Sequence, residues 1–409
     1  MKILLSAYSC EPGKGSEPGV GWNIAREVSR HHQVWVFTRP DESKAAIEAE
    51  LARDPNPNLN FVYFTLPFWK DSLKWGQSGA MQIHYYLWQV QAFFVARRLH
   101  KKIGFDLAHH VTFVKYSTPS FISLLKIPFV WGPVGGGEQA PKPFFKDFNT
   151  KAKRYETLRL WAHRIGELDP FTRSTARRSV QVRATTHDTA ARLKLMGATN
   201  VRVTSESGLA QDEIDRLGQC PVPPSSPVRF ISMGRILHWK GFHLGLRAFA
   251  HANLPDAEYW ILGDGPELEN LTALAAELGI SDRVKFWGRL PRDTSLEKLA
   301  QCHVLVHPSL HDSGGWVCLE GMAAGRPILC LDLGGPAVQV TEATGRKIPA
   351  HTPEQVVRDM GQAMTDLALD PALRGKMGNA GRELVRANYS WQARGEQLDR
   401  LYRELVTNV

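Results

Sequence analysis

The stretch RFISMGRILHWKGF, residues 229–242, decides the fold. An apolar run ends at Gly234, and Arg235 and Lys240 follow in a short polar turn before a helical pattern begins. A buried strand that leads through a turn into a helix is the repeating unit of parallel α/β sheets. Two cations beside a helix N-terminus suit a diphosphate, although a surface Arg and Lys next to an ordinary turn would give the same pattern.

The same strand pattern recurs on both sides of this stretch, with helical patterns between several of the strands, notably around 81–100. We expect buried strands at residues 2–7, 33–38, 60–65, 106–111 and 129–132, and again at residues 229–234, 258–263, 284–288, 303–308 and 327–332. This alternation predicts an α/β fold with two doubly wound parallel sheets. Ligands of such folds bind at the carboxyl ends of the strands, so we expect a cleft that faces both sheets.

The domain boundaries follow from composition. The segment GQCPVPPSSP (218–227) has four prolines and two serines, which predicts a linker. We therefore expect one domain at 1–205, a linker region at 206–227 and a second domain at 228–385. An amphipathic helix is expected at 388–408.

Composition excludes several classes of protein. The chain has 409 residues, of which 43% are hydrophobic and 22% charged, so disorder and coiled coil are excluded as main descriptions. Its five cysteines form no C-x-x-C pair, which excludes a disulfide scaffold and a structural zinc module. No apolar stretch reaches the roughly 18 residues of a transmembrane helix, and the first apolar run is too short for a signal peptide. We expect a cytoplasmic protein.

Charge is unevenly distributed along the chain. Residues 1–205 contain 29 Lys and Arg and 16 Asp and Glu, a net charge of +13, whereas the remainder has 21 and 25, a net charge of −4. The basic residues cluster at 97–102 and at 151–183, which suggests an anionic partner or, alternatively, solvated helix faces. Trp69, Trp75 and Trp88 lie near basic or tyrosine-rich segments, where they could stack on sugars, meet a membrane interface or pack in the core.

A second candidate site is HPSLHDSGGWVCLEGMAAGRP (307–327). A strand ends in a loop whose glycines, Gly314 and Gly315, open a helix with N–H groups available to an anion. Asp312 lies in the loop, and Glu320 lies eight residues further along, inside the helix. Both carboxylates could accept hydrogen bonds from sugar hydroxyls. Alternatively, Glu320 could have a structural partner, because a buried glutamate needs one.

Three further segments of the first half follow predicted strands. GKGSEPGVGWN (13–23) is glycine-rich but matches neither G-x-G-x-x-G nor a Walker A loop, which weakens a dinucleotide or ATP hypothesis. DLAHHVTF (106–113) carries His109 and His110 at a strand end, where only one is expected to face the cleft. WGPVGGGEQAP (131–141) offers a flexible backbone at Gly136 and a carboxylate at Glu138. No metal-binding motif and no G-x-S-x-G elbow occurs in the sequence.

Taken together, these segments resemble a known family. A glycine-rich first turn, R-x4-K, GDGPE (263–267), FWGRL (286–290) and an acid-x7-Glu stretch occur in this order. They resemble family 4 of the retaining glycosyltransferases, which have the GT-B fold of two Rossmann-like domains. The likeness is strongest over 229–340. It also implies that the C-terminal helix packs back on the first domain.

The resemblance implies roles for individual residues. Arg235 and Lys240 would hold the donor diphosphate, Glu320 the ribose and Asp312 the donor sugar, where the family more often has Glu. His110, or else His109, would lie near the sugar in the first domain. Further donor contacts would come from Gly19, Gly21, Gly234, Arg289, Leu290, Ser313, Gly314, Gly315, Trp316 and Val317. Sugar or acceptor contacts would come from His109, Glu17, Gly136 and Glu138.

The implied reaction moves a sugar from a nucleoside diphosphate sugar to a hydroxyl of a glycan, lipid-linked or small-molecule acceptor, with retention and without a metal ion or other cofactor. The basic first domain would suit peripheral contact with anionic membrane at its cytoplasmic face, and no nucleic-acid partner is expected. Two alternatives stay open. A GT-B nucleotide-sugar epimerase would recruit Glu17 and Glu138 as acid and base, and a binding protein without turnover is the other alternative.

Overall fold

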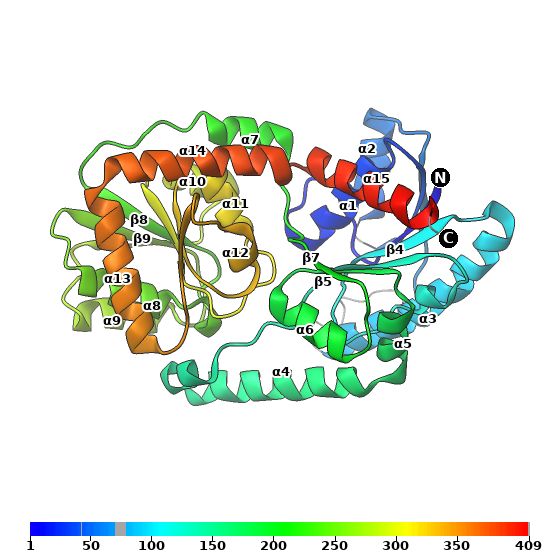
Figure 1. Cartoon of the computed structure of the whole chain (residues 1–409), viewed down its shortest axis with the longest axis horizontal. Coiled ribbons are helices and arrows are strands. Elements are labelled where there is room, and N and C mark those ends of the chain that lie inside the picture. The colour runs from blue at the N-terminus through cyan, green and yellow to red at the C-terminus, as the bar shows by residue number, and fades with distance from the viewer. Residues whose placement is uncertain (42, 70–78, 408–409) are drawn as a thin grey trace. The chain divides into compact units, whose positions relative to one another are not determined.

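The computed structural model describes residues 1–41, 43–69 and 79–407 and divides into two compact units (Figure 1). Unit 1 comprises residues Met1–Gly137, Leu158–Glu206 and the chain from Trp391 onward. Unit 2 comprises Glu138–Thr157 and Ser207–Ser390. Each unit is built around its own parallel sheet, so each is described separately.

Within the described residues, unit 1 has a seven-stranded sheet in the order β3-β2-β1-β4-β5-β6-β7, with every pairing parallel. Its strands are β1 (Lys2–Ala7), β2 (Gln33–Thr38), β3 (Leu59–Tyr63), β4 (Leu107–Thr112), β5 (Phe129–Val134), β6 (Gln181–Ala184) and β7 (Val201–Val203). Its helices are α1 (Ser16–Val28), α2 (Lys44–Arg53), α3 (Gly79–Ile103), α5 (Pro170–Arg178), α6 (His187–Leu195) and α15 (Trp391–Thr407), with a 3-10 turn, η1 (Phe121–Leu124). Helix α4 (Thr150–Leu168) carries the chain from unit 2 into unit 1.

The described part of unit 2 has a six-stranded parallel sheet in the order β10-β9-β8-β11-β12-β13. Its strands are β8 (Val228–Met233), β9 (Ala257–Leu262), β10 (Val284–Gly288), β11 (Val304–His307), β12 (Ile328–Leu331) and β13 (Gly345–Ile348). Its helices are α7 (Gln211–Gly218), α8 (Phe242–Ala252), α9 (Leu268–Glu277), α10 (Arg292–Ala300), α11 (Trp316–Ala323), α12 (Gly334–Gln339), α13 (Pro353–Leu369) and α14 (Pro371–Asn388), with 3-10 turns η2 (Lys142–Asp147) and η3 (His238–Lys240).

The predicted fold class is confirmed, since both sheets are doubly wound. The predicted strands are present with ends shifted by up to two residues, but β6, β7 and β13 were not predicted. Their sequences, QVRA, VRV and GRKI, are short and place charged residues inside the strand. Such segments lack the continuous apolar run typical of buried parallel strands.

The chain enters unit 2 earlier than the predicted boundaries allow. Ala140, Phe144, Phe148 and Ala152 are buried in the core of unit 2, so residues 138–157 belong to it rather than to the domain expected at 1–205. The segment expected as a linker at 206–227 contains helix α7, which buries Ile214 and Leu217 against α11 and its neighbours. Apolar burial, not proline content, decides both assignments.

The C-terminal helix α15 packs within unit 1 beside α1 (Figure 1). Gly395 of α15 allows close approach, because a Cβ there would lie 2.5 Å from the Cβ of Glu27. The buried Leu398 and Tyr402 face the same side of α15. This arrangement covers one side of the first sheet.

In each sheet the strand order reverses between two central strands, β1 and β4 in unit 1 and β8 and β11 in unit 2. Loops that leave neighbouring strands in opposite directions diverge at such a point and form a crevice at the carboxyl edge. The loops after β8 and β11 contain Arg235, Lys240 and Asp312. The fold therefore places the two predicted anion-binding segments side by side.

Candidate donor site in unit 2

Lys240 and Asp312 join the loops that follow β8 and β11. Lys240 Nζ lies 2.5 Å from Asp312 Oδ2, and both side chains are about four-fifths buried. His307, the last residue of β11, places its Nε2 3.1 Å from the same oxygen. The backbone N–H of Gly335 donates to the main-chain carbonyl of Asp312 at 2.7 Å. One carboxylate thus fixes both loops.

Charge and burial act in opposite directions on this carboxylate. Burial alone would raise the pKa of Asp312, but the Lys240 ammonium and the hydrogen bond from His307 hold that pKa well below its usual range. Burial lowers the pKa of His307, against the opposing effect of Asp312. At neutral pH the cluster therefore contains an ionised Asp312.

The glycine-rich loop leads directly into helix α11. Gly315 is the N-cap residue of α11 and has a φ of 59°, which a glycine adopts at little cost. The carbonyl of Gly314 accepts hydrogen bonds from Ser207 Oγ at 2.5 Å and from Gln339 Nε2. Ser313 Oγ donates to Glu138 Oε2 at 2.8 Å. These contacts with Ser207, Gln339 and Glu138 fix the loop. Trp316 and Val317 are the first residues of α11, so their N–H groups have no intrahelical acceptors and are available to an anion.

Glu320 lies inside α11, is 5% exposed and has a partner. Arg292, at the start of α10, places its Nη1 2.8 Å from Glu320 Oε1 and also pairs with Glu213 of α7. Burial raises the pKa of Glu320, and Arg292 opposes that rise. Among the described residues Glu320 Oε2 accepts no hydrogen bond, so one oxygen remains available as an acceptor.

Arg235 differs from Lys240 in its surroundings. It is exposed, and within residues 1–41, 43–69 and 79–407 its guanidinium forms no ion pair. Gly234 before it is also exposed, with a φ of 141°. The GDGPE loop packs tightly behind this turn, since a Cβ on Gly263 would lie 1.8 Å from the carbonyl oxygen of Gly234. At the end of β10, Arg289 is exposed and Leu290 packs against the core of unit 2.

The glycines predicted to approach the donor in unit 1 have a packing role. Gly19 and Gly21 are buried in α1, where added Cβ atoms would lie 2.1 Å from the Lys14 carbonyl oxygen and 2.4 Å from the Ser9 carbonyl oxygen. Glu17, in the first turn of α1, accepts the N–H of Phe113, a residue with a φ of 57°. Burial raises the pKa of Glu17. Glu17 therefore stabilises the strained start of the loop after β4.

The two adjacent histidines of β4 face opposite sides of the sheet, and both are buried. His109 lies between Tyr402 Oη and the Gly132 carbonyl oxygen, each 2.5 Å from a ring nitrogen. His110 Nε2 lies 3.2 Å from Tyr85 Oη and 3.0 Å from the Thr112 carbonyl oxygen, whereas its Nδ1 has no partner in the described part of the chain. Burial lowers the pKa of His110 to about 3 and that of His109 well below its usual range. Both rings are neutral at pH 7.

Several site residues were missed from the sequence. The structure joins Lys240 to Asp312 and Glu138 to Ser313, but pairs Glu320 with Arg292. Gly136, the remaining predicted contact, lies after β5 in unit 1 with a φ of 92°. His307 ends a predicted strand and could have been found from that position. Arg292, Ser207 and Gln339 lie in segments that carried no motif.

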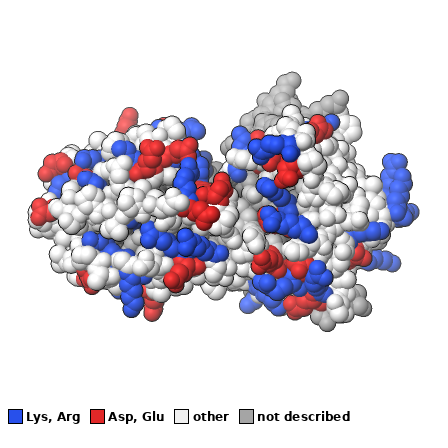
Figure 2. Space-filling view, turned by 90° about the horizontal axis from the view of Figure 1, so that it is seen from above, with Lys and Arg blue, Asp and Glu red and all other residues white. Residues whose placement is uncertain are grey.

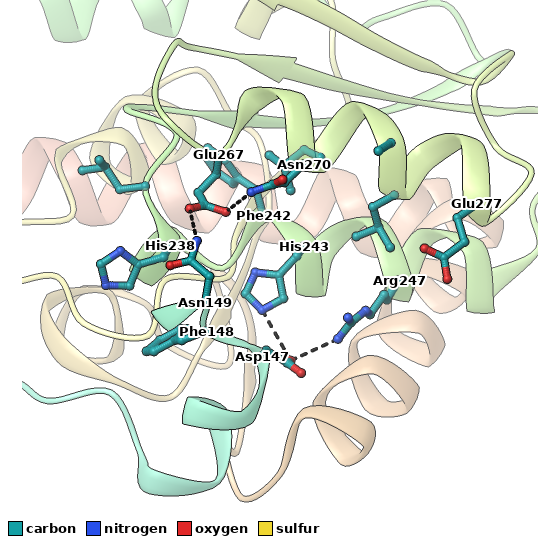
Figure 3. A pocket seen from close by; sticks show the side chains of 14 residues that line it. Asp147, Phe148, Asn149, His238, Phe242, His243, Arg247, Glu267, Asn270 and Glu277 are labelled. Atoms are coloured by element: carbon teal, nitrogen blue, oxygen red, sulfur yellow. Dashed lines mark hydrogen bonds and ion pairs between the residues drawn. The ribbon is translucent and has the colours of Figure 1, made fainter. Parts of the chain in front are cut away.

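A cavity of about 290 Å³ lies elsewhere in unit 2, between residues 147–149 and helices α8 and α9 (Figure 3). Asp147 accepts a hydrogen bond from Arg247 Nη1 at 3.0 Å and forms an ion pair with His243. Glu267 accepts from Asn149 and Asn270. None of the predicted site residues lines this cavity, and these polar side chains pair with one another. They fasten residues 138–157 to the unit.

Among the described residues, no group of three His, Cys, Asp or Glu side chains could hold a metal ion.

The family model for group 1 glycosyl transferases matches residues 220–384. The matched segment includes Arg235, Lys240, Asp312 and Glu320, whereas Ser207 and Glu138 lie outside it. Residues 220–384 therefore form a group 1 glycosyl transferase domain. Unit 1 lies outside the matched segment, and its sheet has the same doubly wound strand order. The predicted family and its GT-B fold are both confirmed.

Curated relatives and a solved structure agree with this assignment. The lipopolysaccharide core biosynthesis glycosyltransferase LpsE of Rhizobium meliloti is 34% identical over 181 residues, 44% of this chain and 50% of LpsE. The alpha-D-kanosaminyltransferase of Streptomyces kanamyceticus is 32% identical over 177 residues, 42% and 45% of the two chains. The chain thus spans about half the length of the curated relatives it matches. Sucrose-phosphate synthase from Thermosynechococcus elongatus has the same fold, with a TM-score of 0.62, 18% identity and complete coverage of both chains.

Proposed function

We propose that this chain is a retaining glycosyltransferase that moves a sugar from a nucleoside diphosphate sugar to a hydroxyl group of an acceptor. The observation that carries the proposal is the junction of the two switch-point loops by Lys240 and Asp312, beside the N-terminus of α11. This junction gathers cationic side chains and backbone N–H groups at the carboxyl edge of the sheet, where ligands of doubly wound folds bind.

The chemistry of the reaction explains why this edge needs positive charge. Cleavage of the bond between the sugar and the diphosphate leaves negative charge on the departing oxygen. Arg235 is exposed and unpaired within the described residues, and Lys240 has three donor hydrogens, of which Asp312 uses one. With the N–H groups of Trp316 and Val317, these donors would stabilise the leaving group in fixed positions. A single donor of this type contributes about 3–4 kcal/mol in comparable oxyanion sites.

Two carboxylates would orient the donor. Glu320 Oε2 would accept hydrogen bonds from the ribose hydroxyls, because Oε1 is already bound to Arg292. Asp312 Oδ2 is occupied by Lys240 and His307, whereas Oδ1 accepts the Gly314 N–H at 3.4 Å and would use its remaining lone pair to accept from a hydroxyl of the sugar. The departing phosphate would take the proton of the attacking hydroxyl, which then attacks from the same face and retains the configuration.

The contacts assigned to unit 1 remain predictions. His110 is neutral and has an unpartnered Nδ1, which suits a hydrogen-bonding role rather than a charged one. The acceptor is assigned only as a hydroxyl-bearing glycan, lipid-linked or small molecule, because the name of LpsE refers to a lipopolysaccharide core whereas that of the kanosaminyltransferase gives only the transferred sugar.

Donor turnover tests the proposal. Labelled UDP-, GDP-, ADP- and dTDP-sugars are incubated with the chain in EDTA, and released nucleoside diphosphate is measured as donor hydrolysis. We expect release from one donor, and a loss of at least about a hundredfold in Glu320→Gln and in Arg235→Ala. Glu277→Gln, an exposed carboxylate that lines the separate cavity, serves as the matched control and should retain the wild-type rate.

The outcomes distinguish the candidate functions. Near wild-type turnover in both site variants would overturn the site assignment. Conversion of one nucleotide sugar into another without release of diphosphate would indicate an epimerase. Binding of a nucleotide sugar without any turnover would indicate a binding protein.

A further inference from the structure

Helix α4 presents an apolar stripe to solvent. Leu158, Trp161, Ile165 and Leu168 follow one another at intervals of three, four and three residues, which places them on one face of the helix. Their exposed fractions are 70%, 60%, 67% and 70%. A helix of a globular protein normally buries such a stripe against the core. None of the described residues of unit 1 covers it.

Helices α3 and α5 of unit 1 also expose apolar side chains. Ile83 and Phe94 of α3 are 58% and 60% exposed, and Phe171 of α5 is 49% exposed. Rings connect these helices, because Phe121 lies 5.6 Å from Tyr86 of α3 and 5.1 Å from Phe171. Helix α5 begins two residues after α4 ends, and both α3 and α5 contact η1 (Figure 1). The exposed residues of the three helices, which we call the apolar face, are Ile83, Leu87, Phe94, Leu158, Trp161, Ile165, Leu168 and Phe171.

Basic charges predominate around the apolar face, and Asp169, the carboxylate between α4 and α5, is engaged by the Phe171 N–H and the Tyr86 hydroxyl. Helices α3 and α5 contain no Asp or Glu, and the two glutamates of α4 point inward: Glu156 is buried, and Glu167 accepts a hydrogen bond from Tyr116. Within unit 1, the exposed basic residues of these helices are Arg97, Arg98, Lys101, Lys102, Arg164, Arg177 and Arg178. On the face drawn in Figure 2, by contrast, basic and acidic side chains are interspersed.

We infer that the apolar face of unit 1 docks on the surface of a lipid bilayer that contains anionic lipids. Interfacial helices bury an apolar stripe in the boundary between headgroups and acyl chains while Lys and Arg contact anionic headgroups. A Trp at the centre of such a stripe suits this boundary, because its ring is apolar and its N–H can reach water. No helix of the described chain is long and apolar enough to cross a membrane, so the docking is peripheral.

Charge and shape argue against other occupants. A second copy of the chain would bring a second basic border against the first, and like charges repel. A nucleic acid would meet the basic residues but would leave Leu158, Ile165 and Leu168 without apolar partners. The combination of aliphatic side chains and predominantly positive charge matches anionic lipid.

The three tryptophans that the sequence offered as interface residues, Trp69, Trp75 and Trp88, differ from Trp161. Trp88 is fully buried, stacked on Phe64 at 4.8 Å, so its role is core packing. Trp69 packs edge-on against His84 at 5.3 Å. Trp75 lies outside the described residues. The inference therefore rests on the apolar face and not on Trp69 or Trp88.

Vesicle sedimentation tests this inference with the full chain. Vesicles of phosphatidylcholine alone are compared with vesicles of equal parts phosphatidylcholine and phosphatidylglycerol. The wild type should sediment with the anionic vesicles. Trp161→Gln/Ile165→Gln should lower the partition coefficient by about a hundredfold, since each large apolar side chain contributes about tenfold. Arg177→Gln/Arg178→Gln should lower it several-fold per residue at low salt.

Leu369→Gln provides the matched control, because Leu369 is 75% exposed at the end of α13 in unit 2 and should not alter binding. All substituted residues are exposed, and circular dichroism melting confirms that each variant is folded. Recovery of the wild type in the supernatant with both vesicle types would overturn the inference. So would unchanged binding of the Trp161/Ile165 variant, equal binding to phosphatidylcholine alone, or a dimer in sedimentation velocity that this variant abolishes.

Discussion

Asp312→Asn removes the negative charge that holds Lys240 between the two loops at the carboxyl edge of unit 2. The ammonium of Lys240 lies 2.5 Å from the carboxylate, and the side chains are 18% and 19% exposed. The Asn variant would keep most of the volume but would leave a largely buried ammonium without its counter-charge. The variant should therefore fold, with reduced stability.

The degree of burial sets the magnitude. Exposed ion pairs contribute about 0–1 kcal/mol, whereas removing one member of a buried pair costs about 3–5 kcal/mol. Because this pair is about four-fifths buried, we expect the free energy of unfolding to fall by roughly 3 kcal/mol. For a unit of this size, that loss corresponds to a decrease in melting temperature of about 6–12 °C.

A double-mutant cycle in urea at pH 7 measures the pair directly. Asp312→Asn, Lys240→Met and the double variant are compared with the wild type, and the coupling energy should be about 1.5–3 kcal/mol. The pKa of Asp312 is lower in the folded state than in the unfolded state, so its contribution is complete above the ordinary aspartate pKa. The difference between wild type and Asp312→Asn should therefore shrink as the pH falls below about 4. A coupling energy below about 0.5 kcal/mol, or a difference that grows in acid, would refute the reasoning.

Three further predictions concern stability. His303 accepts the N–H of Arg229 on Nδ1 and donates from Nε2 to the Pro224 carbonyl oxygen, and burial lowers its pKa to about 4. The pKa of His303 is lower in the folded state than in the unfolded state, so its contribution to the free energy of unfolding is complete above about pH 6.5 and should be lost between about pH 6.5 and pH 4. In His303→Asn the urea midpoint should therefore depend less on pH over this window. An unchanged dependence of the midpoint on pH would contradict this role of His303. Gly245→Ala should lower the free energy of unfolding by about 1–3 kcal/mol, because the new Cβ would lie 2.3 Å from Tyr259 Oη. A calorimetric melting temperature equal to that of the wild type would contradict this prediction. Tyr402→Phe should lower the free energy of unfolding by about 1–3 kcal/mol, because it leaves the buried His109 Nδ1 without its partner. Amide hydrogen exchange should accelerate in α15 but not in α13. Unchanged protection of the α15 amides would contradict this prediction.

The fold could be predicted where local pattern and tertiary role agree. The strands around β8 and β11 are continuous apolar runs that end at a turn, so their ends were nearly correct. Strands β6, β7 and β13 are held by their neighbours in the sheet rather than by their own sequence, so no local pattern indicated them. The segment 138–157 has no boundary signal either, because its place in unit 2 depends on where Phe144 and Phe148 are buried.

The candidate site shows the same division. The glycine-containing loops with Arg235, Lys240 and Asp312 could be predicted as site loops, because parallel sheets bind ligands with the loops at the carboxyl ends of their strands. The pairings could not, because they join residues far apart in the chain. Glu320 needed a partner on energetic grounds, but only the structure identifies that partner as Arg292.

Nucleotide binding tests the central claim most directly. Isothermal titration calorimetry with UDP, GDP, ADP and dTDP in EDTA should detect saturable binding of one of the four. Arg235→Ala should weaken this binding by at least about tenfold, because the proposed site assigns charge-assisted hydrogen bonds with the diphosphate to its guanidinium. The matched control Arg358→Ala, an exposed arginine of α13, should bind as the wild type does. Absence of binding for all four nucleotides, or equal affinity in Arg235→Ala, would contradict the account.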